Sequence, residues 1–222
     1  MTSVIGALCW FHEPAAALER LVRSLEGVVD ELVCLDGPWQ HFPHRHLRSP
    51  DDQAASLRET AAEIGLPLQL LGGDQLFDSQ VAKRSLLYST AAARGDWLLV
   101  VDGDEEIGHH DPALRQLLAA TPLQVGSVPI RRVSSDPRRD LERSARRLFR
   151  TEHGLSVMET HNGIVTDDGL WLAGPRRIAK QPTVNCAPHL RILHHHQSRG
   201  EQRNNWSRRY YHTRARLRIE VH

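Results

Sequence analysis

The sequence predicts an α/β fold: a mostly parallel sheet flanked by helices, then a smaller irregular region and a C-terminal helix. Three observations predict it. Short apolar runs alternate with amphipathic segments through the first half of the chain. The apolar runs are continuous, as in parallel strands that are covered on both faces. Glycine or Asp-Gly follows several of these segments, where helices and strands commonly end.

The expected elements alternate up to residue 103. Strands are predicted over 3–10, 31–37, 66–72 and 96–103. Helices are predicted over 14–28, 51–65 and 79–95, with Pro14 in a first turn and Gly65 and Gly95 at helix ends. This order brings the carboxyl ends of the strands to one edge of the sheet, where such folds bind ligands.

The second half is less regular. A short helix is expected over 113–120 and a strand over 125–133. Strands and turns are expected over 155–174, and another apolar run begins at 190. The polar, basic segment 200–220 is expected to be helical.

Charge, cysteine content and hydropathy limit the class of protein and its expected location. The 222 residues carry a formal net charge of +1, which gives no general attraction to nucleic acid or to a membrane. The three cysteines, Cys9, Cys34 and Cys186, are widely spaced and predict reduced thiols. No signal peptide is evident, and no apolar run approaches the roughly 20 residues that span a bilayer. We therefore expect a cytoplasmic protein without a membrane span.

Four carboxylates follow the run "GDWLLVV": Asp102, Asp104, Glu105 and Glu106. Their mutual repulsion needs compensation at the end of a buried strand. An Asp-x-Asp pair in an extended chain points to one side, so that both carboxylates can bind one Mn²⁺ or Mg²⁺. The alternative is a turn with solvated acids, because Asp-Gly is also common turn chemistry.

A histidine run ends the later apolar segment "LRIL". Strand alternation puts His194 and His196 on one face and His195 on the other. An imidazole can complete a carboxylate-dominated Mn²⁺ or Mg²⁺ site. A surface histidine cluster is the alternative.

In chain order, these segments resemble a GT-A (Rossmann-like) glycosyltransferase of the family 2 type. The resemblance rests on Trp10 to Glu13, on Asp36, and on the segments "AKRSLLYSTAAARGDWLLVVDGDEEI", "RSARRLFR" and "ILHHHQSR". The best match covers residues 4–107. The chain departs from the family pattern at Ser85, at Gly37-Pro38-Trp39 and at His161-Asn162.

The resemblance implies one domain over residues 1–222: a nucleotide-sugar half (1–107), an acceptor and metal-completing half (108–200) and a basic C-terminal helix (201–222). It implies a nucleotide-sugar donor, such as a UDP- or GDP-sugar, together with Mn²⁺ or Mg²⁺. Trp10, Glu13, Asp36 and Arg84 are expected around the nucleotide, with Asp102 on the ribose or the metal. Asp104 is the expected principal metal ligand, completed by His194 or His196.

Sugar transfer also needs neutralisation of the leaving group and a base for the acceptor hydroxyl. Lys83, Arg84 or an arginine within 143–150 could supply positive charge. Glu159 and His161 are candidate bases, with Asp167 and Asp168 behind them, although exposed polar positions are the plainer interpretation. Inversion at the anomeric carbon is the family expectation.

Two arginine-rich segments, 131–150 and 199–218, leave other functions open. If helical, they are most often solvated faces, but they can also bind phosphates or an anionic acceptor. The aromatics of "NNWSRRYYHTRARLR" also fit nucleic-acid binding, and hence a phage-type glycosyltransferase acting on a hydroxylated DNA base. A nucleotidyltransferase or phosphohydrolase and a non-enzymatic nucleic-acid-binding module are further alternatives. The sugar, nucleobase, acceptor and oligomeric state stay undetermined.

Overall fold

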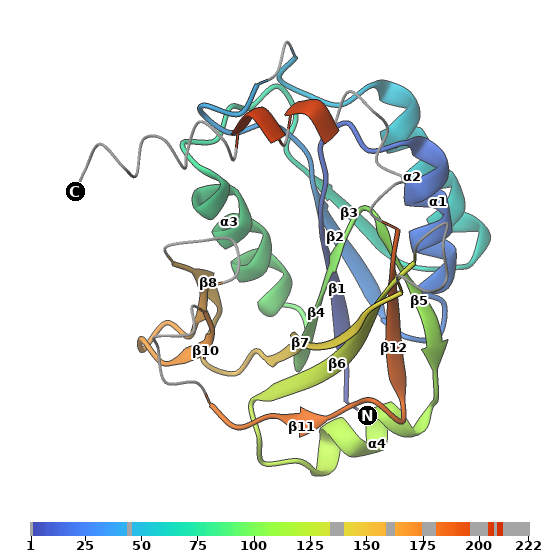
Figure 1. The fold of residues 1–222 in the computed structure, drawn as a ribbon, viewed down its shortest axis with the longest axis vertical. Helices are drawn as coiled ribbons and strands as arrows, with labels where there is room; N and C mark the ends of the chain where they lie inside the picture. The colour runs from blue at the N-terminus through green and yellow to red at the C-terminus, as the bar shows by residue number, and fades with distance from the viewer. Residues whose placement is uncertain are drawn as a thin grey trace.

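In the computed structural model a curled central sheet lies between helices (Figure 1). The structure describes residues 2–43, 46–133, 140–158, 163–174, 181–195, 204–206 and 208–210. Mixed α/β architecture, with helices on both faces of the sheet, is the predicted fold class, which is confirmed.

The first half of the chain forms the predicted parallel part of the sheet. It comprises β1 (Val4–Cys9), β2 (Glu31–Leu35), β3 (Leu68–Leu71) and β4 (Trp97–Asp102), in the spatial order β3-β2-β1-β4. All four expected strands are present and are shorter than predicted. Their carboxyl ends lie at one edge, so the loops that follow β1, β2 and β4 come together there.

Beyond β4 the sheet becomes mixed. The next strands in space are β7 (Glu142–Arg150), β6 (Val125–Arg132), β12 (Leu190–His194) and β5 (Glu105–His110), and β11 (Val184–Asn185) also pairs with β6. Strand β7 is antiparallel to both β4 and β6, and β5 is antiparallel to β12. Only Gly103 and Asp104 separate β4 from β5, although three strands lie between them in the sheet order. The sheet must therefore curl to bring β5 back beside the end of β4.

Helices cover both faces because strand side chains alternate between two cores. Helices α1 (Ala15–Ser24) and α2 (Asp51–Glu63) pack with Val4, Leu8 and Leu99 on one face. Helix α3 (Gln80–Ala92) packs with Ile5 and Val100 on the other. Both sets are buried, so these strands read as continuous apolar runs.

The remaining elements lie at the margins of the sheet. Helix α4 (Ala113–Ala120) follows β5, and β8 (Ser156–Val157), β9 (Ile164–Val165) and β10 (Trp171–Ala173) form a separate antiparallel sheet next to α3. Short helical turns at 204–206 and 208–210 belong to the predicted C-terminal helix, the rest of which lies outside the described residues. The described parts of the arginine-rich segment 131–150 are strands β6 and β7, not a helix.

Helix ends follow local chemistry. Ser79 caps α3 by accepting a hydrogen bond from the Ala82 N–H at 3.0 Å. Gly65 follows α2 with φ +67°, as expected for a helix-terminating glycine. Gly95 has a different role, because a Cβ there would lie 2.7 Å from the Ile5 side chain. None of the helices in the described part of the chain has the length and apolarity needed to cross a membrane.

Candidate active site

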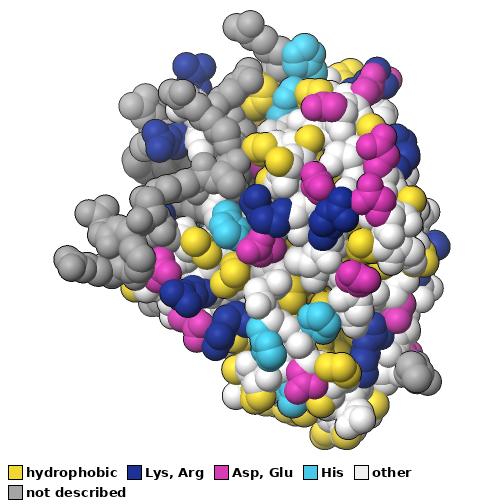
Figure 2. All heavy atoms as spheres, turned by 90° about the vertical axis from the view of Figure 1, so that its right-hand side faces the viewer, with side chains coloured by type: hydrophobic (Ala, Val, Ile, Leu, Met, Phe, Trp, Pro, Cys, Tyr) yellow, Lys and Arg dark blue, Asp and Glu magenta, His cyan; other side chains and the backbone are white. Residues whose placement is uncertain are grey.

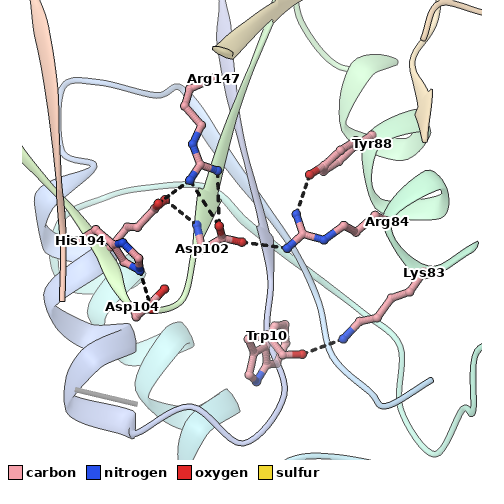
Figure 3. A network of polar contacts seen from close by, with 9 residues as sticks. Trp10, Lys83, Arg84, Tyr88, Asp102, Asp104, Arg147 and His194 are labelled. Carbon is pink, nitrogen blue, oxygen red and sulfur yellow. Dashed lines mark hydrogen bonds and ion pairs between the residues drawn. The ribbon is translucent and has the colours of Figure 1, made fainter. Parts of the chain in front are cut away.

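The four carboxylates lie on a tight turn between β4 and β5, which we call the acidic turn (residues 102–106). Asp102 ends β4, Gly103 and Asp104 form the turn, and Glu105 begins β5. The chain is not extended across Asp102-Gly-Asp104, so strand alternation does not place the two aspartates side by side. Each carboxylate instead lies within ion-pair distance of an arginine or a histidine. Figure 3 shows these contacts for Asp102 and Asp104.

Asp102 is held between two arginines. Arg84 of α3 donates from Nη2 to Oδ1 at 2.8 Å, and Arg147 of β7 approaches Oδ2 at 3.3 Å. The other terminal nitrogen of Arg84 donates to the hydroxyl of Tyr88 at 2.9 Å. Burial opposes the charge of Arg84, but Tyr88 and Asp102 keep its pKa well above the ordinary value. Asp102, which was expected to contact the ribose or a metal ion, is thus part of an internal ion-pair network.

Glu105 lies beneath this network. Its side chain is 2% exposed, forms an ion pair with Arg147 and accepts a hydrogen bond from the Asp102 N–H at 2.9 Å. Burial raises the pKa of Glu105 to about 7, while Arg147 acts in the opposite direction. Arg147 therefore bridges two carboxylates of the acidic turn. In the sequence, Glu105 was noted only as one of four clustered carboxylates, and Arg147 only as one of the arginines within 143–150 that could supply positive charge.

Asp104 contacts the predicted histidine. His194 Nε2 lies 2.9 Å from Asp104 Oδ2, and the His195 N–H donates to the Asp104 carbonyl at 2.7 Å. The pairing of β12 with β5 sets this contact, because His194 lies opposite Glu105 in the register. The hydrogen bond to Asp104 raises the pKa of His194. The structure thus brings together two of the predicted metal ligands, while His196 lies outside the described residues.

Glu106, the fourth carboxylate of the acidic turn, lies close to Arg20 and His195. Arg20 of α1 lies 2.8 Å from one carboxylate oxygen and His195 Nε2 lies 3.0 Å from the other. In Figure 2 the face that carries α1 and β5 shows acidic and basic side chains interleaved. Neighbouring cationic groups therefore offset the repulsion within the acidic turn.

The loop after β1 packs against the acidic turn. Glu13 is buried, and a Cβ on Gly103 would lie 2.8 Å from its Cγ. Glycine at position 103 therefore leaves room for Glu13. Trp10, also predicted to line a nucleotide pocket, is buried in the core near the end of β1.

Lys83 holds the loops after β1 and β2 from beneath. It is 0% exposed and donates from Nζ to the carbonyl oxygens of Trp10 at 2.7 Å and Gly37 at 2.5 Å. Its ammonium group also lies 5.9 Å from the ring centroid of Trp39. Its contacts are those of a structural tether between the two loops, and the side chain has no exposed surface for a ligand.

Asp36 organises the long loop after β2. Its carboxylate accepts hydrogen bonds from the Ser49 N–H at 2.8 Å, the Ser49 hydroxyl at 2.7 Å and the Gly37 N–H at 2.7 Å. The Ser49 hydroxyl in turn accepts from the His12 N–H at 2.9 Å. Asp36 thus links the loops after β1 and β2.

A cavity of about 520 Å³ opens between these loops. Its lining includes His12, His46, Arg48, Ser49 and Asp74. The rings of His12 and His46 are stacked 5.7 Å apart. His12 and Asp74 both have positive φ, +52° and +47°, which is uncommon outside glycine and costs free energy. One residue links this cavity to the acidic turn: His12 lines the cavity, and the next residue, Glu13, packs against Gly103.

Aromatic side chains near the C-terminus pack beside this cavity. Trp206 meets the ring of His12 edge-on at 5.1 Å, and Tyr210 lies 5.7 Å from the rings of both Trp39 and Phe42. Sequence reasoning considered Trp206 and Tyr210 for base stacking. In the structure both contact rings of their own chain, while Tyr211 lies outside the described residues.

Of the predicted catalytic residues Glu159, His161 and Asp168, the structure describes Asp168. Asp168 lies in the turn between β9 and β10, and its hydrogen bond with the Thr166 hydroxyl lowers its pKa. A carboxylate with a lowered pKa is a weak base, so these contacts fit a turn-forming role. Glu159 and His161 lie outside the described residues.

The positions of these side chains show which of them could be ligands of a divalent cation. Asp104 and His194 supply a carboxylate oxygen and an imidazole nitrogen close together, which fits two ligands of Mn²⁺ or Mg²⁺. Asp102 fits poorly, because guanidinium groups contact both of its oxygens. Within the described ranges, no group of three or more His, Cys, Asp or Glu side chains could hold a metal ion. Any cation here needs further ligands from a bound substrate or water.

Comparisons with known proteins find only distant similarity to solved structures. No family model matches the chain, and no curated protein matches it in sequence. One similar solved structure is a putative glucose-1-phosphate thymidylyltransferase from Bacillus anthracis in complex with a sucrose, at 11% identity and a TM-score of 0.38. The similarity covers 86% of this chain and 72% of that one.

Another similar solved structure is 4-diphosphocytidyl-2C-methyl-D-erythritol synthase from Anaerococcus prevotii DSM 20548. Identity is 10% and the TM-score is 0.34, over 86% of this chain and 71% of that one. At these values the likeness says nothing about chemistry, which must be argued from the site.

Proposed function

We propose that this chain is a glycosyltransferase that uses a nucleotide-sugar donor. One observation carries the proposal: His12 lines the cavity, and the next residue, Glu13, packs against Gly103 of the acidic turn. A nucleoside in the cavity would direct its diphosphate toward Asp104 and His194. The acidic turn follows β4 at the carboxyl edge of the parallel strands, the edge at which α/β sheets bind ligands.

The donor needs its diphosphate neutralised, because negative charge grows on the leaving oxygen as the sugar is transferred. A divalent cation, when bound, would neutralise that charge, and Asp104 and His194 are the residues that would hold it. His194 has its pKa raised by Asp104, so the imidazole must give up any proton before it binds a metal. Asp36 and Ser49 fix the loop that lines the nucleoside end.

The acceptor hydroxyl needs a base on the far side of the sugar. Glu159 and His161 remain our candidates, and Asp168 is the weaker one because of its lowered pKa. Inversion of the anomeric carbon stays the expected stereochemistry. The acceptor class stays open.

A nucleotidyltransferase is the principal competing function. One solved structure named above is called a thymidylyltransferase and the other a diphosphocytidyl synthase, but likeness at this level carries no argument for either function. The products separate the two functions: a glycosyltransferase releases a nucleoside diphosphate, whereas a nucleotidyltransferase acting on a nucleoside triphosphate releases pyrophosphate. A DNA-modifying glycosyltransferase would share the donor and differ in acceptor.

A thermal-shift panel tests the donor assignment. UDP, GDP, CDP and their sugar conjugates are added with and without Mn²⁺, since a ligand that binds the folded state raises its melting temperature. We expect at least one nucleoside diphosphate to raise it, and Ser49→Ala to reduce the shift, with exposed Arg58→Ala on α2 as control. No shift with any nucleotide would contradict the proposal.

A further inference from the structure

The acidic turn receives its counter-charges from its own chain. Arg147 contacts both Asp102 and Glu105, and Arg84 contacts Asp102 from the opposite side. The arginines come from strand β7 and helix α3, so elements distant in sequence converge on the end of β4 (Figure 3).

We propose that Arg84 and Arg147 are resident cations of the acidic turn, which hold Asp102 as an ion-pair partner and remove it from the set of metal ligands. Any divalent cation at this site is then confined to Asp104, His194 and the ligands that a substrate brings. This inference concerns internal contacts and goes beyond the proposed function.

Because these ion pairs are largely buried, they exclude metal ligation by the same oxygens of Asp102. The side chains of Arg84 and Arg147 are 10% and 13% exposed, and that of Asp102 is 25% exposed. A buried charge without a partner is costly, and removal of one partner from a buried pair is strongly destabilising. A metal ion that took the oxygens of Asp102 would have to displace a guanidinium and leave it largely buried. The ion pairs and metal ligation at Asp102 therefore compete.

The geometry also favours arginine over lysine. Arg147 Nη2 reaches Oδ2 of Asp102 at 3.3 Å and also contacts Glu105, and Nη1 lies 3.4 Å from the same oxygen of Asp102. A planar guanidinium with several donors can serve two carboxylates at once, whereas an ammonium is a point charge. Arg147 is therefore a positioning residue, which orients Asp102 relative to the turn.

The test uses the full chain without nucleotide, so that it does not depend on the proposed function. Thermal unfolding is measured in EDTA and in Mn²⁺ alone, and Mn²⁺ binding is followed by electron paramagnetic resonance. The variants are Arg147→Met, Arg147→Lys, Asp102→Asn and the double variant Glu105→Gln with Arg147→Met. Arg191→Met is the control, because Arg191 on β12 pairs with Glu142 at 3.2 Å in an exposed position.

We expect the wild-type melting temperature to be the same in EDTA and in Mn²⁺. Arg147→Met should lower it by about 10 °C, with part of the loss recovered by the double variant, which removes the unpaired buried carboxylate. The melting temperature of Arg147→Lys should lie below that of wild type. Arg191→Met should change the melting temperature by no more than about 3 °C. Any Mn²⁺ binding by the wild type should survive Asp102→Asn.

Two results would overturn the inference. One is Mn²⁺ alone raising the wild-type melting temperature in a manner that Asp102→Asn abolishes, since Asp102 would then be a metal ligand. The other is Arg147→Met melting like wild type. If Arg147→Met does not fold, the Asp102→Asn comparison still decides the ligand question. Failure of the nucleotide panel would leave the inference intact.

Discussion

The indole of Trp206 stacks on the ring of Phe11, with centroids 6.2 Å apart and planes inclined by 25°. This contact joins the C-terminal helical turn to the loop after β1, which also supplies His12 to the cavity lining. Figure 1 shows the turn lying over the carboxyl end of the sheet. The C-terminal segment therefore belongs to the surroundings of the candidate nucleoside site.

Trp206→Ala should weaken both stability and nucleotide binding. The substitution removes ring contacts with Phe11, His12 and Phe42, and aromatic pairs are each worth about 0.5–1.5 kcal/mol beyond their buried area. We expect a loss of roughly 1.5–4.5 kcal/mol in urea unfolding and a smaller thermal shift with nucleotide. Asn205→Ala, on the exposed side of the same turn, should change neither.

Gly103→Ala should disturb the acidic turn through Glu13. The added methyl would lie 2.8 Å from Glu13 Cγ, which must move. Overpacking of this kind costs about 1–3 kcal/mol, and urea unfolding measures the loss. In a Glu13→Ala background the same substitution should cost little, because the side chain that it would clash with is gone. An equal cost of Gly103→Ala in both backgrounds would show that the clash is not the cause.

The parallel half of the fold was predictable because its signals are local. Continuous apolar runs such as 96–103 identify buried strands, and Gly65 marks a helix end. The strand β7 was missed because its arginines obscure the apolar pattern. Arg146 and Arg147 point to different partners, the former to the carbonyls of Leu172 and Gln181 and the latter to the acidic turn.

The candidate site was predictable in residue type and less so in pairing. Asp104 and His194 do meet, as the metal-site hypothesis required. The partnership of Asp102 with Arg84 and Arg147 depends on how α3 and β7 pack beside β4, and no local sequence pattern encodes that register. Lys83 likewise looks like a phosphate ligand in sequence, yet it is buried beneath two loops.

Lys83→Met should be strongly destabilising. The substitution keeps the apolar stem and leaves the buried carbonyls of Trp10 and Gly37 without this donor, at about 1–3 kcal/mol each. Urea unfolding measures the loss. Arg20→Met removes the half-exposed pair with Glu106 and should cost no more than about 1 kcal/mol. Equal losses for the two variants would contradict the tether role of Lys83.

The His194–Asp104 contact should make stability depend on pH. The pKa of His194 is raised in the folded chain, so its protonated form binds Asp104 more favourably than the unfolded chain allows. This stabilisation is present in full below the ordinary histidine pKa of about 6.5 and is lost as pH rises through the higher folded value. In metal-free buffer, the melting temperature of wild type should therefore exceed that of His194→Gln at acidic pH. The difference should shrink toward alkaline pH. His109→Gln, on the exposed end of β5, should show no such trend. A wild-type advantage that grew with pH would mean that the neutral imidazole, not the imidazolium, makes the stabilising contact.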